Sequence, residues 1–300
     1  PWNKPMSAPD TLTLTSLRTT DFAPGQLGVL GDPIAHSLSP AMHNAALAML
    51  LPTHPRLAGV RYHRLHITAE ELPAALTLLH GKGFAGVNLT VPHKIQALTL
   101  VATLSPEARR AESVNTLVRT PTGWAGHTTD GQGFLEALRE RTGGTTKGRP
   151  VILLGSGGAA RAVAAACLDD GCASLSLHNR DVAKATDLAA TLADPRVRAA
   201  GLDEIKASPD AVIVNCTVLG LKPGDASPFP SELLAADQFV FDTTYGDVTS
   251  CLLRQAQARG VPGCDGRAML RWQGALAFRL WNGMLPPDAP MRAALGESAL

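Results

Sequence analysis

The stretch "VILLGSGGAARA", Val151 to Ala162, decides the fold of the second half of the chain. Its apolar start predicts a buried strand, and its alanine-rich end predicts a helix. Between them, the pattern G-x-G-x-x-A falls on Gly155, Gly157 and Ala160. In such a turn the first glycine allows the sharp bend, the second lets the backbone approach a pyrophosphate, and the alanine permits close packing of helix on strand. The stretch therefore predicts a dinucleotide-binding unit, and the plainer alternative is an ordinary tight turn.

The residues after the next predicted strand, "HNRDVAK", bear on which dinucleotide binds. NAD sites usually place an acidic residue here for the ribose 2′-hydroxyl, whereas NADP sites tend to use arginine. Arg180 is well placed for a 2′-phosphate, and Lys184 follows it by one helical turn. Asp181 opposes this interpretation, because its carboxylate would repel the phosphate. We expect NADP, and the alternative is a solvated helix start in which Asp181 only complements the helix dipole.

Predicted strands and helices alternate along both halves of the chain, which is typical of the α/β class. In the first half we expect strands at 26–31, 61–67 and 84–91, helices from an N-cap at Ser39, at 69–83 and at 92–104, and two short strands within 111–130. In the second half we expect helices at 130–144, 182–193 and around 249–260, further strands at 211–217 and 238–244, and a final amphipathic helix at 269–285. The pattern predicts two α/β domains.

Composition excludes several classes of protein. The 300 residues suffice for two domains, 45% of them are apolar, and the net charge is +1. That balance gives no electrostatic case for a nucleic-acid or membrane partner, and no apolar stretch approaches the ~18 residues that span a bilayer. The five cysteines are odd in number and form no CxxC pattern, and the nine histidines lie in no metal-ligand cluster. We therefore expect a cytoplasmic protein without a metal site, and both a monomer and a homodimer stay open.

A lysine interrupts the apolar segment "GVNLTVPHKIQAL", which begins at residue 86. Its polar residues include Asn88, Thr90 and Lys94, whereas Val91 and Ile95 are expected in the core. Ligands bind at the carboxyl ends of strands in α/β units. When a hydride adds to a ketone, an alkoxide develops and needs a proton, which a lysine ammonium group can supply. We expect Lys94 to supply it.

A carboxylate beside the lysine would orient it and stabilise its charge, and Asp130 is our candidate. Plainer roles remain open for each polar residue taken singly. Lys94 could extend along the surface to water, and Asp130 and Ser39 could cap helices.

A series of motifs resembles the shikimate dehydrogenase family from about Leu27 to Gly283, in the family's order and spacing. The motifs are "GDPIAHSLSPAMHNAAL", "GVNLTVPHK", "SVNTL", "TDG", "GSGGAARA", "NR", "VNCTVLGL", "FDTTY" and "MLRWQGALAFRLWNG". The resemblance implies reversible, NADPH-dependent reduction of 3-dehydroshikimate to shikimate, in the pathway to chorismate and aromatic amino acids. It also implies a substrate domain, 1–129 completed by 267–300, and an NADP-binding Rossmann-like domain, 130–266, with the last helix returning to the first domain.

The resemblance further implies a role for each matched residue. Lys94 and Asp130 match the catalytic pair. The residues that match substrate contacts are Ser37 and Ser39 (on the carboxylate), Asn88, Thr90, Asn115, Tyr245 and Gln273. The residues that match NADP contacts are Gly155, Ser156, Gly157, Gly158, Ala159, Asn179, Arg180, Lys184, Thr243 and Gly266. Several amide and hydroxyl groups suit a polyhydroxylated ring, because a site built to bond hydroxyls rejects ligands that lack them.

Three sites, with four residues in all, depart from the family's usual pattern. The family usually has asparagine where Thr128 stands, threonine where Asp181 stands, and Asn-Pro where Gly246 and Asp247 stand. Asp181 keeps open an NAD-dependent quinate/shikimate dehydrogenase. A catalytically silent sensor of shikimate or nucleotide is the other alternative, and the intact pair of lysine and aspartate argues against it.

Overall fold

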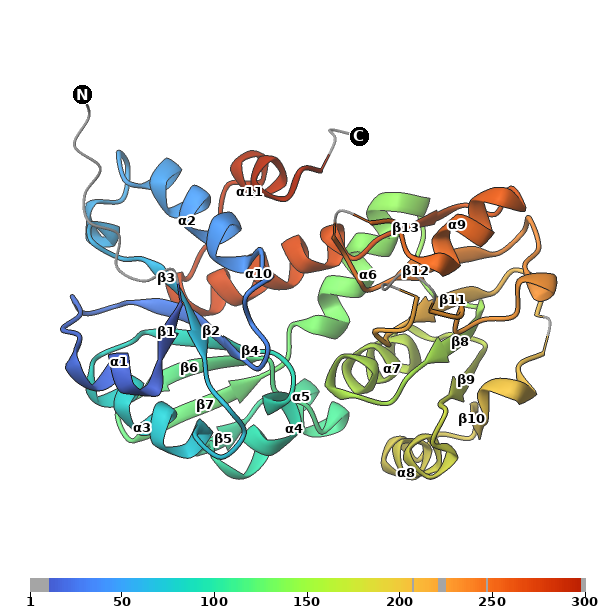
Figure 1. Ribbon diagram of the computed structural model, residues 1–300, viewed down its shortest axis with the longest axis horizontal. Coiled ribbons are helices and arrows are strands. Elements are labelled where there is room, and N and C mark those ends of the chain that lie inside the picture. The colour runs from blue at the N-terminus through green and yellow to red at the C-terminus, as the bar shows by residue number, and fades with distance from the viewer. Residues whose placement is uncertain (1–10, 207, 221–224, 247, 298–300) are drawn as a thin grey trace. The chain divides into compact units, whose positions relative to one another are not determined.

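The computed structural model describes residues 11–206, 208–220, 225–246 and 248–297, and Figure 1 shows its helices and strands. Contacts within the chain divide it into two compact units. The first unit contains the chain up to Ser105, Val114–His127, and the chain from Gly274 onward. The second unit contains Pro106–Ser113 and Thr128–Gln273. Asp247, one of the departures in sequence, lies outside the described residues.

This division differs from the expected domain boundaries in three places, the smallest being Thr128 and Thr129, which belong to the second unit. Helix α5 (Pro106–Ala111) belongs to the second unit, and Ser113 just after it donates from Oγ to the Gly158 carbonyl at 2.8 Å. The first turns of helix α10 also belong to the second unit. There Arg271 pairs with Glu140 at 2.6 Å, and both side chains are buried. Because α10 ends beyond the unit boundary, its later turns belong to the first unit.

The first unit is built on a mixed sheet in the order β1-β3-β2-β4-β6-β7-β5. Strands β1, β3, β2 and β4 run parallel, whereas β6 is antiparallel to both β4 and β7. The strands are β1 (Leu12–Thr13), β2 (Leu27–Gly31), β3 (Tyr62–His66), β4 (Gly86–Leu89), β5 (Thr103–Leu104), β6 (Thr116–Thr120) and β7 (Gly123–His127).

Helices complete the first unit on both sides of this sheet (Figure 1). They are α1 (Leu14–Thr19), α2 (Ser39–Leu50), α3 (Leu72–Gly81), α4 (His93–Gln96), the end of α10 (Arg267–Asn282) and α11 (Asp288–Leu295). Trp281 of α10 packs with the buried cluster of Leu27, Val29 and Tyr62, and its Nε1 donates to the Leu117 carbonyl at 2.9 Å. The later turns of α10 are therefore part of the core of the first unit.

The second unit is built on a fully parallel sheet in the order β10-β9-β8-β11-β12-β13. Its strands are β8 (Pro150–Leu154), β9 (Ser174–His178), β10 (Val197–Ala200), β11 (Val212–Asn215), β12 (Phe239–Asp242) and β13 (Gly263–Cys264). Its other helices are α6 (Asp130–Thr142), α7 (Gly158–Asp170), α8 (Val182–Leu192) and α9 (Cys251–Ala258).

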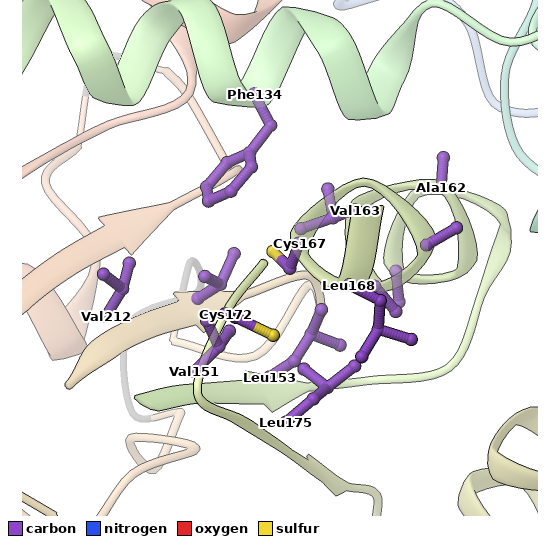
Figure 2. Close-up of a cluster of buried hydrophobic side chains, with 14 of the residues drawn as sticks. Phe134, Val151, Leu153, Ala162, Val163, Cys167, Leu168, Cys172, Leu175 and Val212 are labelled. Atoms are coloured by element: carbon purple, nitrogen blue, oxygen red, sulfur yellow. The ribbon is translucent and has the colours of Figure 1, made fainter. Parts of the chain in front are cut away.

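Alternation along the central strand β8 explains how this sheet is covered on two faces. Val151 and Leu153 join one buried cluster, and Ile152 and Leu154 join another, because successive side chains of a strand point to opposite faces. Figure 2 shows the first cluster, where Phe134 of α6 points toward the layer formed by side chains of α7 and the strands. Parallel strands buried on both faces read as continuous apolar runs, which is why the sequence predicted β8, β9, β11 and β12 but not the edge strands β10 and β13.

Some expected elements were wrong. Instead of one helix at 92–104, the chain forms α4, a 3₁₀ turn at Ala97–Thr99 and strand β5. The Ala102 N–H donates to the Trp124 carbonyl at 2.8 Å, so pairing with β7 replaces the helical hydrogen bonds here. Val91 and Ile95 are 64% and 44% exposed rather than in the core. The helix at 269–285 is not the last one either, because α11 follows it and packs against α2.

Candidate active site

Each unit has a topological switch point. This is a central strand at which the order of the strands along the chain changes from one side of the sheet to the other. In the first unit β2 lies between β3 and β4, and in the second unit β8 lies between β9 and β11. Such a point opens a crevice outside the carboxyl ends of the two strands, where α/β proteins bind ligands. Nearly all of the expected site residues lie on segments that follow strands at or beside these two points.

Ser37 and Ser39 lie just after β2, at the start of α2. The Ser39 N–H donates to Ser37 Oγ at 3.4 Å, and the Ser37 carbonyl accepts from Arg64 Nη2 at 2.8 Å. The cap position of α2 is Leu38, and no side chain caps the helix, so the expected capping role of Ser39 was wrong. Two hydroxyls beside the N–H groups of an uncapped helix start are suited to an anion.

Thr90 and Lys94 follow β4 on a segment fixed by the backbone. The Thr90 N–H donates to the Leu30 carbonyl at 2.9 Å, which ties this segment to β2. The Lys94 carbonyl accepts from the Val114 N–H at 2.8 Å, which ties α4 to the residues before β6. The side chain of Lys94 is partly buried. The short helix therefore presents one ammonium group from a rigid support.

Asn88 and Asn115 meet at the end of β4, under the same switch point. Asn88 Nδ2 donates to the Asn115 carbonyl at 3.1 Å and to Thr116 Oγ1 at 2.9 Å. Asn88 Oδ1 accepts from Tyr62 Oη at 2.7 Å. The antiparallel register of β4 and β6 pairs Asn88 with Thr116, which explains why these distant residues of the sequence are in contact.

The glycine turn lies at the switch point of the second unit. Gly155 has φ +108°, and a β-carbon there would lie 3.2 Å from the Cys216 carbonyl oxygen that follows β11. Gly157 is the cap residue of α7, with extended backbone and no side-chain cap, and the space beside it is open. The N–H groups at the start of α7 thus face open space bordered by Ser156, and this arrangement fits a pyrophosphate.

The residues expected at the 2′-phosphate border the same turn. Asn179 Nδ2 donates to Ser156 Oγ, and Asn179 Oδ1 accepts from the Asp181 N–H at 3.0 Å. Lys184 Nζ lies 3.6 Å from Asp181 Oδ2, and both side chains are largely exposed. Asp181 is the cap residue of α8 but makes no capping hydrogen bond. Lys184 and the exposed Arg180 thus place two cations beside one partly neutralised carboxylate.

Thr243 and Tyr245 follow β12 in a loop that hydrogen bonds hold firmly. Thr243 Oγ1 donates to the Asn215 carbonyl at 2.8 Å, and the Gly266 N–H donates to the Thr244 carbonyl at 2.9 Å. Burial raises the pKa of the Tyr245 hydroxyl. The structure therefore brings Thr243 and Gly266 into one wall of the second unit.

The expected site residues do not include the pair that supports this wall, Asp242 and Asn215. Asp242 is fully buried and accepts from Thr244 Oγ1 at 2.7 Å and Ser250 Oγ at 2.6 Å, and Asn215 Nδ2 donates to it at 3.1 Å. The repeated Asx-x-Thr of "NCT" and "DTT", each at the end of a strand, is the signal that could have found it.

Asp130 and Gln273 lie on α6 and α10, two helices that approach each other closely within the second unit. Asp130 is the first residue of α6 and is 4% exposed, and the cap position is Thr129, so the alternative in which Asp130 only caps the helix does not apply. One turn along, a β-carbon on Gly133 would lie 2.7 Å from the Gln273 backbone nitrogen, so the two helices pass very closely. Gln273 is 8% exposed. Lys94 belongs to the first unit and Asp130 to the second.

Two absences hold for the residues that the structure describes. Within them, no three His, Cys, Asp or Glu side chains are grouped as ligands for a metal ion. None of the helices in this part of the chain combines the length and the apolar character that crossing a membrane requires.

Three family models of shikimate dehydrogenase domains match the chain. The substrate binding domain of shikimate dehydrogenase matches residues 29–117, the shikimate/quinate 5-dehydrogenase family matches 137–218, and the shikimate 5′-dehydrogenase C-terminal domain matches 266–295. The shikimate dehydrogenase (NADP(+)) of Symbiobacterium thermophilum is 40% identical over 293 residues, which are 94% of this chain and 97% of that protein. An enzyme of the same description from Thermus thermophilus is 42% identical over 269 residues, 90% of this chain and 97% of that protein.

A solved structure matches as well. It is the crystal structure of a shikimate 5-dehydrogenase from Thermus thermophilus in complex with NADP(H) and shikimate. It has a TM-score of 0.78 and 39% sequence identity, and the match covers 91% of this chain and 98% of that one.

Proposed function

The chain belongs to the shikimate dehydrogenase family, and we propose that it reversibly reduces 3-dehydroshikimate to shikimate with NADPH, on the route to chorismate and aromatic amino acids. The observation that carries this proposal is the pair of switch points. One carries a glycine turn at a helix start, and the other carries hydroxyl, amide and ammonium groups. We assign the first unit to the substrate and the second to NADP.

The second unit would hold NADP with its backbone and two cations. The N–H groups of residues 155–159 would bond the pyrophosphate, and Arg180 and Lys184, with Asn179 between turn and helix, would meet the 2′-phosphate. Thr243 and Gly266 would line the nicotinamide. When bound, the cofactor supplies the hydride that adds to the substrate's carbonyl carbon.

The first unit would hold the substrate by its carboxylate and its ring hydroxyls. Ser37 and Ser39 would donate to the carboxylate, where the N–H groups of the α2 start add a favourable dipole. Asn88, Thr90 and Asn115 would bond ring hydroxyls, and we also assign Tyr245 and Gln273 of the second unit to the substrate. Buried amides of fixed direction favour a hydroxylated ring over an apolar one.

Lys94 would protonate the oxygen that becomes an alkoxide during reduction. An ammonium group within hydrogen-bonding reach supplies the proton as charge develops, and in the reverse direction the neutral amine accepts it. Asp130 would pair with Lys94, orienting it and favouring its charged form.

A second candidate, an NAD-dependent quinate/shikimate dehydrogenase, is favoured by one observation. Asp181 stands where an acidic residue serves the ribose 2′-hydroxyl of NAD. Its ion pair with Lys184 weakens that case, because a neutralised carboxylate repels a 2′-phosphate less. We therefore keep NADP as the cofactor, and we propose the cytoplasm as the location from the odd number of cysteines.

The test is to follow near-ultraviolet absorbance while the purified protein is incubated with shikimate and NADP⁺, beside NAD⁺ and beside quinate. We expect fast reduction of NADP⁺ with shikimate. Preference for NAD⁺, or equal use of quinate, would move the protein to the second candidate. Binding of shikimate without turnover of any pair would show a sensor instead.

A further inference from the structure

The polar side chains under the first switch point form one directional chain of hydrogen bonds. Tyr62 Oη donates to Asn88 Oδ1 at 2.7 Å, and Asn88 Nδ2 donates to Thr116 Oγ1 at 2.9 Å. Thr116 Oγ1 in turn donates to Asn115 Oδ1 at 2.9 Å. None of the four side chains is more than 5% exposed. Buried polar networks of this kind fix orientations, because every alternative leaves a buried group without its partner.

The direction of the Asn88 amide is set by a group that can only accept. Asn88 Nδ2 lies 3.1 Å from the Asn115 carbonyl, and a carbonyl oxygen cannot donate. The nitrogen must therefore face that carbonyl, and both of its hydrogens are used, one there and one on Thr116. A ligand hydroxyl that reaches Asn88 meets the oxygen of the amide, an acceptor.

The hydroxyl group of Thr116 then determines the orientation of the second amide, that of Asn115. Its hydroxyl has one hydrogen, and because it accepts from Asn88 it can give that hydrogen to Asn115 Oδ1. The oxygen of the Asn115 amide then faces Thr116, and its nitrogen points the other way. A ligand hydroxyl that reaches Asn115 meets a donor.

We propose that Thr116 is a positioning residue for substrate recognition, holding Asn88 as an acceptor and Asn115 as a donor. The proposal rests on the proposed function, because it takes the ligand to be a ring with several hydroxyls. A hydroxyl both donates and accepts, whereas a keto group only accepts and a hydrogen does neither. Two amides locked in opposite directions therefore select hydroxylated rings, and Thr116 does this without touching the substrate.

Three variants separate the hydroxyl of Thr116 from its shape. Thr116→Val keeps the shape and loses the hydroxyl, Thr116→Ala loses both without any new clash, and Thr116→Ser keeps the hydroxyl. We expect the valine and alanine variants to raise the KM for shikimate about tenfold, the effect of losing roughly one oriented hydrogen bond. The kcat and the KM for NADP⁺ should stay within about twofold of the wild type, and the serine variant should resemble the wild type.

The preference for shikimate over an analogue lacking one ring hydroxyl is the decisive measurement. We expect the ratio of the two kcat/KM values to fall about tenfold in the valine and alanine variants and to be kept in the serine variant. An unchanged ratio, or a serine variant as impaired as the valine variant, would overturn the proposal. A merely structural residue would lower the melting temperature without changing this ratio.

Failure of the proposed function would be visible separately. If the wild type does not reduce NADP⁺ with shikimate, the proposed function is wrong, and calorimetric binding of shikimate to the same variants still tests the network. Equal affinity of the wild type and the valine variant for shikimate would then contradict the role of Thr116.

Discussion

The two switch points are built by opposite means. At β8 and β11 the groups assigned to the ligand are backbone N–H groups, and the turn there contains only the small residues glycine, serine and alanine. At β2 and β4 they are side chains, and each of the two amides is held by another buried side chain or carbonyl. A phosphate needs only several N–H groups at the right spacing. A ring hydroxyl needs a donor or an acceptor of known direction, so its site requires a second layer of residues that fix the first.

This difference predicts which kinds of substitution impair each site. The backbone site, at β8 and β11, should be damaged by changes in chain geometry or free space. The side-chain site, at β2 and β4, should be damaged by single functional groups, including groups that never touch a ligand. The expected effects range from the loss of the reacting group to a change in one exposed ion pair.

The largest effect is expected at the reacting group of the side-chain site. Lys94→Ala should lower kcat by at least ~10²-fold, the usual loss for a general acid or base, because no other group then transfers the proton to or from the reacting oxygen. The melting temperature should hardly change, since the backbone bond from Val114 to the Lys94 carbonyl remains. Turnover numbers measured with saturating shikimate and NADP⁺ check this. Lys147→Ala, an exposed lysine of the second unit, is the control, and near wild-type turnover by Lys94→Ala would contradict the assignment.

The next effect concerns acid stability, and it involves a residue under the side-chain site. His43 is fully buried and stacks on Tyr62 with ring centroids 4.2 Å apart. Burial lowers its pKa from 6.5 to about 3. Between these two pKa values the unfolded state binds a proton that the folded state does not bind. The contribution of neutral His43 to the free energy of unfolding is therefore fully present above pH 6.5 and is lost as the pH falls toward 3.

Between pH 6.5 and pH 5, His43 should remove about 2 kcal/mol from the free energy of unfolding. His43→Phe keeps an aromatic ring on Tyr62 and cannot be protonated, so it should flatten this part of the pH profile. Urea unfolding at a series of pH values measures it, with His54→Gln, outside the core, as control. A profile as steep as that of the wild type would show that His43 is not the source.

The backbone site should distinguish two glycines that look alike in the sequence. Gly155 has φ +108°, where a β-carbon is strained, so Gly155→Ala should cost about 1–2 kcal/mol of stability and also raise the KM for NADP⁺. Gly157 has φ −75° and open space beside it, so Gly157→Ala should leave stability unchanged and raise only the KM for NADP⁺. Melting temperatures and KM values test the pair. Equal destabilisation by both changes would contradict the contrast.

The sequence predicted the backbone site better than the side-chain site, for a physical reason. A glycine turn between an apolar strand and a helix is a local pattern, so Gly155 and Gly157 could be predicted from a dozen residues. The contact of Asn88 with Thr116 depends on the register of β4 and β6, which no local pattern encodes. Tyr62 and Thr116 are absent from the predicted site residues for that reason, although Asn88 and Asn115 beside them are among those residues.

Local propensity also failed where tertiary pairing decided the structure. The segment after Pro92 contains enough helix-forming residues to predict one long helix, yet β5 pairs with β7 and the helix ends at Gln96. Val91 and Ile95 in the same segment are apolar, as core residues usually are, and yet they are exposed. Periodicity alone does not show which side chains of this segment are exposed.

The smallest effect is expected at the edge of the backbone site, where a side chain takes part in cofactor choice. Asp181→Asn removes the carboxylate and leaves Lys184 without the partner now 3.6 Å away. Exposed ion pairs are worth about 0–1 kcal/mol, so the KM for NADP⁺ should fall only about two- to fivefold while the KM for NAD⁺ does not improve. Because both side chains are exposed, added salt should shrink the difference. Asp187→Asn, another exposed acid on α8, is the control. A higher KM for NADP⁺ in Asp181→Asn would mean that Asp181 holds Lys184 in place for the phosphate, and the edge of the backbone site would then obey the same rule as the side-chain site.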